Sequence, residues 1–252
     1  MSVVDQIRDF WNADAATYDL DPGHHPDGEI QRAAWRAALE TLLPPSPAAV
    51  LDVGAGTGFI SLLAAELRHE VTAVDISPRM LARLRQKAAS SQVEVTAIEA
   101  DAIAVPRGPF DVVVSRHLLW TLVDPVAALA AWRAATPLGL LILIDRDWGG
   151  ESATVALRRL GHRALDRLRS TPPTHHSTYG PEVARLLPLA GGARPADLLP
   201  LPLSELESSP LLWHPSRGFS PVAGFGSDLT AERAPPERWS YIRSPGAEWL
   251  GI

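Results

Sequence analysis

Three glycines follow an acidic residue in the segment LDVGAGTGF, residues 51–59. Gly54, Gly56 and Gly58 predict a turn in which the backbone approaches a ligand closely, because glycine has no side chain. A dinucleotide-binding turn instead spaces its glycines as G-x-G-x-x-G and presents helix-start N–H groups to a pyrophosphate. Asp52, two residues before the turn, would repel phosphates but attract a positively charged group. The segment therefore favours a ligand that lacks phosphate and carries positive charge.

Two further acids lie where such a ligand would bind. Asp75 ends the strand predicted after the glycine turn, and Asp101 follows the next strand. A carboxylate at Asp75 can accept hydrogen bonds from both hydroxyls of a ribose, and Asp101 can accept one from an adenine amino group. Ile76 and Ala102 would flank the adenine with apolar surface. S-adenosylmethionine matches this set, because it joins an adenosine to an ammonium and a sulfonium and has no phosphate.

Ser115, Arg116 and His117 follow the fourth predicted strand and are expected beside the reacting group. His117 is the candidate base, because an imidazole changes its charge near neutral pH; the alternative is a histidine that only makes a local hydrogen bond. Ser115 or Arg116 would offer a backbone carbonyl to the cofactor. Trp120, at helical spacing, is expected to pack rather than to contact a substrate.

The N-terminal segment is predicted to form a lid, with Tyr18 near the methionine end of the cofactor and His24 and His25 in a loop over the acceptor. His175 and His176 form a second pair. Three roles stay open for these pairs: a metal site of four histidines, a place in the substrate pocket, or an ordinary position in a loop. Adjacent histidines usually point apart, so we predict no metal site and treat His24 and His25 as weaker catalytic candidates.

Apolar strands alternate with amphipathic helices in the first 145 residues. This order predicts an α/β fold with a doubly wound, mostly parallel sheet that is covered on both faces. Ser77 and Asp124 precede prolines and are expected to cap helices. Strands are predicted at 48–53, 71–75, 93–100, 110–115 and 138–145, and helices at 1–20, 29–43, 58–68, 77–89 and 125–135.

Beyond Asp145 the pattern weakens. Residues 151–170 predict a helix and PEVARLLPLA a short one, whereas the proline-rich remainder predicts an irregular C-terminal region in which LLPLPLSELESSPLL could add an edge strand. We therefore divide the chain into a helical lid at 1–45, a cofactor-binding core at 46–190 and a C-terminal region at 191–252 that completes or flanks the sheet edge.

Composition excludes several classes of function. The 252 residues carry a net charge of −6, contain no cysteine and show no dense basic run, so a nucleic-acid partner and a thiolate nucleophile are not expected. No apolar run is long enough to cross a bilayer and the start of the chain does not resemble a signal peptide, which predicts a cytoplasmic protein without a membrane partner. Lys87, the only lysine, is expected on a solvated helix face.

The segments FWNADAATYD, LDVGAGTGF, VTAVDISPRML, IEADA, FDVVVSRHLLWTLVDP and LLILID together resemble the class I S-adenosylmethionine-dependent methyltransferases, in that family's order and over more than half of the chain. The likeness is to the branch that methylates N, O or C atoms of small molecules, because SRHL stands where enzymes acting on DNA bases or protein amides have N/D-P-P-Y/F. It implies a seven-stranded sheet whose last two strands form a hairpin. The predicted cofactor-binding residues are Tyr18, Asp52, Gly54, Ala55, Gly56, Asp75, Ile76, Asp101, Ala102, Ser115 and Arg116.

Two other functions could use a similar sheet and glycine turn. A short-chain nicotinamide reductase needs Tyr-x-x-x-Lys, and none of Tyr18, Tyr179 and Tyr241 has a lysine four residues later. A non-catalytic protein that binds S-adenosylmethionine or serves in assembly stays open, as does the choice between a monomer and a homodimer.

Overall fold

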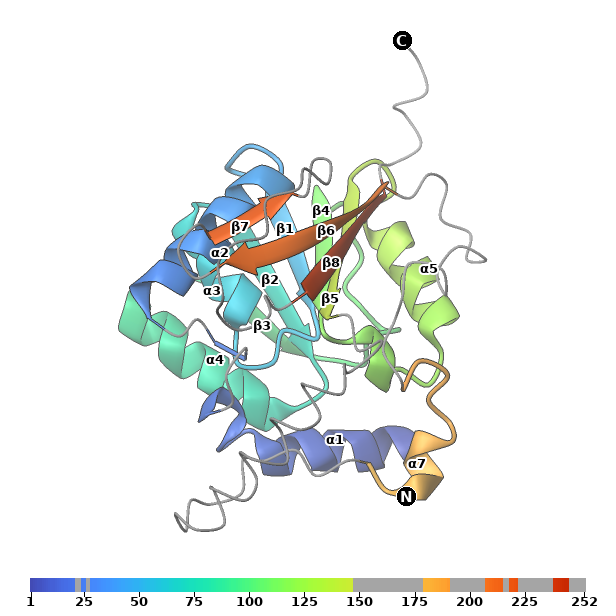
Figure 1. Cartoon of the computed structure of the whole chain (residues 1–252). Coiled ribbons are helices and arrows are strands. Elements are labelled where there is room, and N and C mark those ends of the chain that lie inside the picture. Colours follow the sequence, from blue (N-terminus) through green and yellow to red (C-terminus); the bar gives the residue numbers. More distant parts are fainter. Residues whose placement is uncertain are drawn as a thin grey trace, which may run out of the picture.

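The computed structural model describes residues 1–20, 24–25, 28–146, 179–190, 207–214, 218–221 and 238–244. Eight strands form one sheet in the order β3-β2-β1-β4-β5-β8-β6-β7 (Figure 1). The strands are β1 (Ala49–Val53), β2 (Glu70–Asp75), β3 (Thr96–Glu99), β4 (Val112–Arg116), β5 (Leu140–Arg146), β6 (Glu207–His214), β7 (Gly218–Pro221) and β8 (Arg238–Ser244).

Helices precede, connect and follow these strands. They are α1 (Val3–Asp14), α2 (Glu29–Leu42), α3 (Phe59–Glu66), α4 (Pro78–Ser91), α5 (Pro125–Ala135) and α7 (Pro181–Ala184), with 3-10 turns η1 (Tyr18–Leu20) and η2 (Leu119–Thr121). The helix predicted at 151–170 lies outside the described residues, and the short helix predicted in PEVARLLPLA is present as α7.

Strands β1 to β5 are parallel, which confirms the predicted doubly wound core. Strand β1 lies between β2 and β4, with Asp52 beside Ala73 and Val53 beside Ser115. The loops that follow β1, β2 and β4 therefore leave the sheet at the same edge. This edge is the one at which open parallel sheets bind their ligands.

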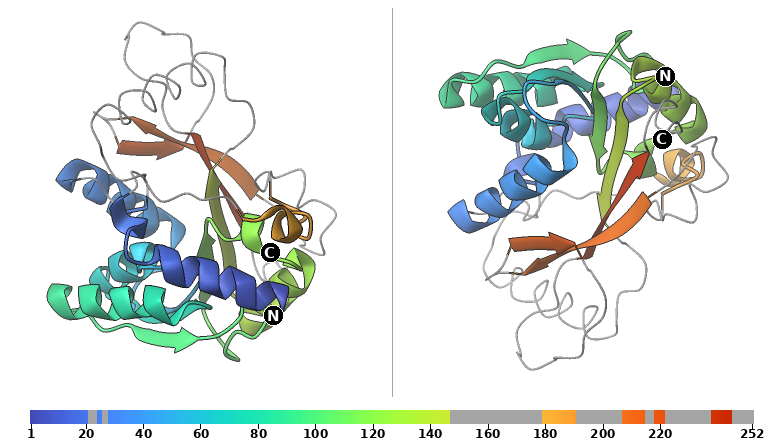
Figure 2. Two further views of the ribbon diagram at one scale, coloured as in Figure 1. Left: turned by 90° about the horizontal axis from the view of Figure 1, so that it is seen from below. Right: turned by 90° about the horizontal axis from the view of Figure 1, so that it is seen from above.

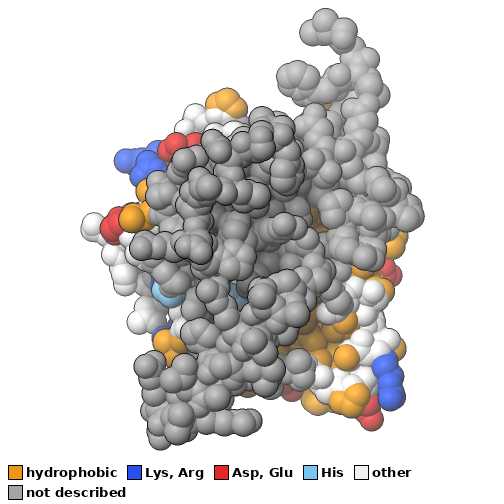
Figure 3. All heavy atoms as spheres, viewed as in Figure 1, with side chains coloured by type: hydrophobic (Ala, Val, Ile, Leu, Met, Phe, Trp, Pro, Cys, Tyr) orange, Lys and Arg blue, Asp and Glu red, His pale blue; other side chains and the backbone are white. Residues whose placement is uncertain are grey.

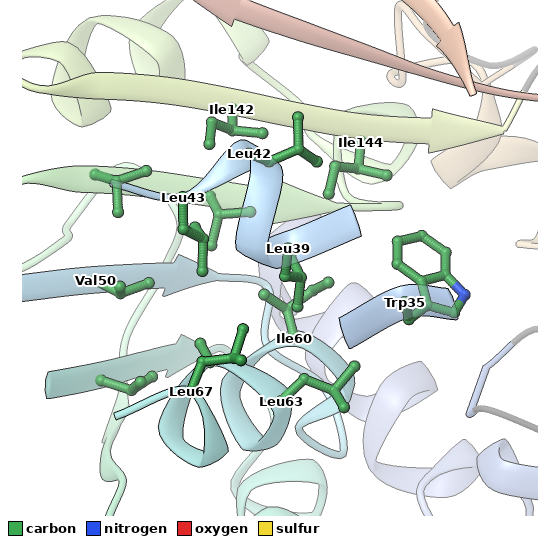
Figure 4. Packing of buried hydrophobic residues seen from close by; sticks show 14 of the residues in the cluster. Trp35, Leu39, Leu42, Leu43, Val50, Ile60, Leu63, Leu67, Ile142 and Ile144 are labelled. Carbon is green, nitrogen blue, oxygen red and sulfur yellow. The ribbon is translucent and has the colours of Figure 1, made fainter. Parts of the chain in front are cut away.

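Apolar side chains cover both faces of the parallel strands. On one face α2 and α3 pack against β1, β4 and β5; Figure 4 shows Trp35, Leu39, Leu42, Leu43, Val50, Ile60, Leu63, Leu67, Ile142 and Ile144 of this cluster. On the other face α5 packs through Leu129 and Trp132, and the Trp132 side chain is fully buried. Alternate residues of each strand thus enter opposite cores, which explains why the sequence reads as continuous apolar runs.

The C-terminal strands correct two sequence predictions. In the described residues, the region expected to be irregular contributes β6, β7 and β8, and the sheet has eight strands rather than seven. Strand β6 overlaps LLPLPLSELESSPLL, where a strand was considered, but it lies between β8 and β7 rather than at the edge. Strand β8 is antiparallel to both β5 and β6, while β7 pairs with β6 and lies beside α2. Pro210 within β6 and Pro221 at the end of β7 hid these strands, because proline has no N–H for a ladder and reads as a break.

Helix α1 crosses the edge of the sheet where the parallel strands end, as the view from below shows (Figure 2). Its Ile7 packs against Val183 and Leu187 at α7, so two segments far apart in sequence meet there. On the face drawn in Figure 3, hydrophobic side chains of the described part gather near this junction. The helix therefore closes the ligand-binding edge from outside the sheet.

The predicted caps allow a direct test of how α4 is held. The Asp124 side chain accepts a hydrogen bond from Ala127 N at 2.9 Å, and Ser77 Oγ accepts one from Met80 N at 3.1 Å. Ser77 Oγ also donates to Asn12 Oδ1 at 2.8 Å. We expect Asp124→Ala to lower the free energy of unfolding by about 1 kcal/mol, the usual value of an N-cap. We expect Ser77→Ala to lower the free energy of unfolding further, because a partly buried hydrogen bond to α1 is lost as well.

Urea denaturation of both variants measures this difference. Equal losses for Ser77→Ala and Asp124→Ala would show that the Asn12 contact adds nothing to stability.

Candidate active site

A cavity of about 240 Å³ opens at the carboxyl ends of β1, β2 and β4, below α1. Its wall includes Val4, Ile7 and Trp11 of α1. Most of the residues predicted from the sequence line it: Tyr18, Gly54, Gly56, Asp75, Ile76, Asp101, Ala102, Arg116 and His117. Asp52 and Ala55 line a smaller adjoining pocket of about 20 Å³, which shares Tyr18, Gly54 and Arg116 with the first.

The glycine turn is held against β2 by its backbone. Gly54 N and Ala55 N both donate to Val74 O, at 2.8 and 3.0 Å. Gly54 has a φ of +71°, and a Cβ there would come within 2.7 Å of the Leu118 side chain. Glycine at this position therefore meets both a left-handed backbone and a close approach, and it leaves the turn open to the cavity.

Asp75 connects the end of β2 to the glycine turn. Its Oδ2 accepts a hydrogen bond from Gly56 N and its Oδ1 one from Ser77 N, both at 2.8 Å. Burial raises the pKa of this carboxyl to about 6, although both backbone donors lower it. Each carboxylate oxygen keeps capacity for a further donor, so Asp75 can accept two hydroxyls from the cavity side.

Asp101 stands on the neighbouring loop. Its Oδ1 accepts a hydrogen bond from Ile103 N at 3.0 Å, and the Trp132 indole on α5 donates to Ala102 O at 2.8 Å. A fully buried ring thus fixes the loop that carries Asp101, while Ala102 lines the same part of the cavity. The predicted pairing of an acid with apolar surface is present there.

Asp52, in β1, lines the smaller pocket and is 2% exposed. Ser61 Oγ donates to its Oδ2 at 2.5 Å. Burial raises the pKa of Asp52 to about 6, against the opposing effect of Ser61. Asp75 lines the larger cavity and Asp52 the adjoining pocket, so each has a carboxyl group in its wall, an environment that suits a ligand with a positive centre.

Arg116 brings a cation into the same wall. Its guanidinium carbon lies 4.0 Å from the Phe59 ring centre and 5.3 Å from that of Trp35, and the residue is 8% exposed. Stacking over two aromatic faces stabilises a desolvated guanidinium. Carboxylates and a guanidinium thus meet around Tyr18, a combination suited to a zwitterionic ligand.

His117 is paired with an acid that the sequence analysis missed. Its Nδ1 lies 2.9 Å from Asp145 Oδ1, and both side chains are largely buried. His117 N donates to Ile144 O at 3.0 Å, and the Trp120 indole donates to His117 O, also at 3.0 Å. Asp145 is the last residue but one of β5, the strand beside β4, and it ended the strand predicted at 138–145; this shared strand edge was the signal that could have identified it.

The lid residues occupy less of the cavity than predicted. Tyr18 lines both pockets, and burial raises the pKa of its phenol to about 12. His24 stacks on Tyr18 with 4.0 Å between ring centres, and its Nδ1 donates to Tyr18 O at 2.9 Å. His24 and His25 line neither pocket, so their role as catalytic candidates gains no support. His175 and His176 lie outside the described residues.

The Ser115 side chain is 2% exposed and donates to Val53 O at 2.9 Å, so it joins β4 to β1. The backbone carbonyl expected from Ser115 or Arg116 stays a prediction, and of these two residues Arg116 lines both pockets. One other sequence interpretation needs correction. Lys87 was expected on a solvated face, but its Nζ donates to Thr57 Oγ1 at 3.0 Å and lies 2.6 Å from Asp19 Oδ2. The contacts of Lys87 join residues that are far apart in sequence, so the spacing of residues within the helix could not predict them.

Aromatic rings extend the wall beyond the predicted residues. Trp11 lines the cavity and lies edge-on to Tyr18, Trp120 and Tyr179, with centre distances of 6.0, 6.0 and 6.4 Å. The Tyr179 hydroxyl hydrogen-bonds with Thr121 Oγ1. Helix α1 is thereby joined to the segment that follows His117.

Within the described ranges, no group of three or more His, Asp or Glu side chains gathers so as to hold a metal ion. Every helix in those ranges is too short or too polar to cross a bilayer.

Comparisons with known proteins identify the family of the chain. The family described as "Methyltransferase domain" matches residues 50–138. A ubiquinone biosynthesis O-methyltransferase of Xanthomonas axonopodis pv. citri is 39% identical over 175 residues, 68% of this chain and 69% of the relative. A demethylmenaquinone methyltransferase of Deinococcus radiodurans is 36% identical over 121 residues, 46% of this chain and 50% of the relative. The chain thus spans about half the length of that relative.

A solved structure shares the fold over nearly the whole chain. It is described as a possible histamine N-methyltransferase from Thermotoga maritima; the TM-score is 0.54, the identity 18%, and the match covers 96% of this chain and 100% of the other. This likeness concerns the fold alone. Together with the Xanthomonas relative and the matching domain, it shows that the chain belongs to the class I S-adenosylmethionine-dependent methyltransferases.

Proposed function

We propose that this chain binds S-adenosylmethionine in the cavity below α1 and transfers its methyl group to an N, O or C atom of a small molecule. The observation that carries the proposal is Asp75, which lines the cavity while its carboxylate is held by Gly56 N and Ser77 N. An acceptor of ribose hydroxyls is thus built into the turn. A pyrophosphate would face Asp52 and Asp75 together, which disfavours a nicotinamide dinucleotide.

The residues around the cavity match the parts of the cofactor. Asp75 would hold the ribose and Asp101 the adenine amino group, with Ile76 and Ala102 on the adenine faces. Arg116 and Tyr18 would lie at the methionine end, beside the smaller pocket. When bound, S-adenosylmethionine supplies a methyl group already activated by a positively charged sulfur, so the protein has to align the acceptor, exclude water and take up a proton where the acceptor carries one.

His117 would take up that proton. With its own proton on Nδ1 toward Asp145, the imidazole leaves Nε2 as the nitrogen that accepts another. Asp145 fixes the orientation of the ring and stabilises the imidazolium that forms. The Trp120 indole holds the His117 carbonyl, so the ring is positioned from the backbone as well.

The N-terminal segment, residues 1–45, would form a lid over the cofactor-binding core at 46–190. Residues 191–252 would complete or flank the edge of the sheet. Helix α1 supports this role, because Val4, Ile7 and Trp11 line the cavity from outside the sheet. The names of the relatives, demethylmenaquinone methyltransferase and ubiquinone biosynthesis O-methyltransferase, favour a small-molecule acceptor. The lack of cysteine favours a cytoplasmic location, and the net charge of −6 disfavours a nucleic-acid partner. A monomer and a homodimer both stay open.

A non-catalytic S-adenosylmethionine-binding protein is the second candidate. Such a protein would bind S-adenosylmethionine with the same residues, but it would not need the His117–Asp145 pair. That pair is buried at the edge of the cavity, an arrangement that favours the enzyme.

Calorimetry with S-adenosylhomocysteine tests the cofactor assignment. Because the pKa of Asp75 is raised to about 6, the group is a carboxylate above that pH and is protonated below it. Ribose hydroxyls donate to the carboxylate form, so the affinity should fall as the pH drops through about 6. Asp75→Asn should weaken binding about 5-fold to 150-fold at neutral pH, by removing a charged acceptor, and flatten this dependence.

Asp52→Asn is the matched control, because burial raises the pKa of Asp52 to about 6 as well. An acid limb that survives Asp75→Asn but is lost in Asp52→Asn would reassign the titrating group. Tighter binding of NAD than of S-adenosylhomocysteine would contradict the cofactor assignment.

The role of His117 is measured by turnover with labelled S-adenosylmethionine and a panel of small phenols and amines. At saturating S-adenosylmethionine, where protonation of Asp75 does not limit binding, His117→Gln should lower kcat about 10²-fold to 10⁴-fold, the usual contribution of a positioned base, and should remove the acid limb of the kcat–pH profile. Asp145→Asn should lower turnover less, because the ring remains but loses its orienting acid. S-adenosylhomocysteine affinity should stay nearly constant in both variants. An acid limb that persists in His117→Gln would place the base elsewhere.

A further inference from the structure

Lys87, Asp19 and Thr57 form a closed polar network outside the wall of the cavity. Lys87 Nζ donates to Thr57 Oγ1 at 3.0 Å, and Thr57 Oγ1 donates to Asp19 Oδ1 at 2.7 Å. The ring closes where Lys87 Nζ meets Asp19 Oδ2 at 2.6 Å. Lysine can only donate, an ionised carboxylate can only accept, and the hydroxyl does one of each. The network uses two of the three Lys87 donors and one contact at each Asp19 oxygen, and it occupies the hydroxyl of Thr57 both as donor and as acceptor.

The network joins three separate parts of the fold. Asp19 lies in η1, Thr57 lies in the glycine turn, and Lys87 lies in the last turns of α4. Thr57 is 1% exposed, whereas the Lys87 and Asp19 side chains are 32% and 30% exposed. The hydroxyl is thus fixed within the turn, and the ion pair is the part that water can reach.

Other residues of α4 contact the N-terminal segment without reaching the glycine turn. Arg83 Nη2 donates to Ala16 O at 3.4 Å, and Arg79 N donates to Asn12 Oδ1 at 3.3 Å. Arg79, Arg83 and Lys87 are spaced four residues apart and so follow one face of the helix. Only Lys87 of these three contacts both the segment and the turn, and Arg83, which is exposed, supplies a matched comparison.

Asp19 is the residue next to Tyr18, which lines both pockets. A Cβ on Gly56 would meet Tyr18 Cε1 at 3.8 Å, so the ring faces the glycine turn at Gly56. The ion pair and hydrogen bond of Asp19 hold the backbone next to that ring. If the backbone at Tyr18 moves away from the turn, Asp19 is drawn from Lys87 and Thr57.

We propose that Lys87 is a positioning residue for cofactor retention: its ion pair with Asp19 at Thr57 holds Tyr18 over the glycine turn, and release of a ligand from the cavity requires this network to open. The proposal rests on the proposed function in taking the ligand to be S-adenosylmethionine or its product. The network acts on dissociation more than on association, because it forms fully only when the segment is closed.

The first experiment follows amide hydrogen exchange at residues 11–20 in the full-length protein without ligand. Lys87→Met keeps the length of the side chain and removes its charge, while Arg83→Met removes one charge from the same helix face. Exchange in this segment should be faster in Lys87→Met than in Arg83→Met or wild type, because the local opening equilibrium shifts. Equal exchange in both variants would overturn the network as a constraint on the segment.

The second experiment measures association and dissociation of S-adenosylhomocysteine by stopped-flow fluorescence. Lys87→Met and Asp19→Asn should each raise the dissociation rate constant about 3-fold to 10-fold, with little change in association. Salt should speed dissociation from wild type by screening the ion pair, and this dependence should shrink in Lys87→Met. Lys87→Arg, which keeps the charge, should restore slow dissociation.

The two measurements separate the possible failures. Dissociation from Lys87→Met that matches Arg83→Met would overturn the role in retention, even where wild type binds the ligand. Wild type that binds no S-adenosylhomocysteine would overturn the proposed function and the retention role together, while the exchange result would still decide whether the network holds the segment.

Discussion

The carboxylate of Asp75 is the interaction on which the arrangement of the site depends. One oxygen holds Gly56 of the glycine turn, and the other holds Ser77 at the start of α4. Ser77 in turn caps α4 and reaches Asn12 of α1. A single side chain at the end of β2 therefore aligns the turn, a helix start and, through one further contact, the helix that covers the cavity. Any ligand that hydrogen-bonds to this carboxylate interacts with a group already oriented by the fold.

Removing these carboxylates from water is unfavourable, and hydrogen bonds and a nearby positive charge offset that cost. Burial raises the pKa of both Asp52 and Asp75 to about 6, yet each accepts at least one strong hydrogen bond. Arg116 stacks on Phe59 and Trp35, so its charge is stabilised by ring faces in the same wall. Opposite charges therefore lie close together in the site, while the carboxylates are held by hydrogen-bond donors and the guanidinium by aromatic rings. A binding site prepared in this way needs little rearrangement when a zwitterion enters.

Local signals in the sequence predicted the parallel half of the fold well. Asp124 before Pro125 and Ser77 before Pro78 placed the starts of α5 and α4 correctly, because caps act within a few residues of chain. Strand ends located Asp75, Asp101 and His117 at one edge for the same reason. Contacts between distant residues were missed: Asp145 beside His117, and Asp19 with Lys87, have no local pattern. Strands β7 and β8 were missed, and β6 was expected only as a possible edge strand, because short segments with serine or proline resemble loops. They become strands by pairing with one another and, through β8, with β5.

The position of Lys87 also has a practical consequence in protein chemistry. It is the only lysine in the 252 residues, so an amine-directed reagent has one side chain to modify besides the terminal amine. That side chain is about one third exposed and is engaged with Asp19 and Thr57. The rate at which Lys87 is acylated therefore reports how often the network opens. A single buried thiol reports local opening of a protein in the same way. A dye attached there would stand at the junction of α4, η1 and the glycine turn, without any engineered attachment site.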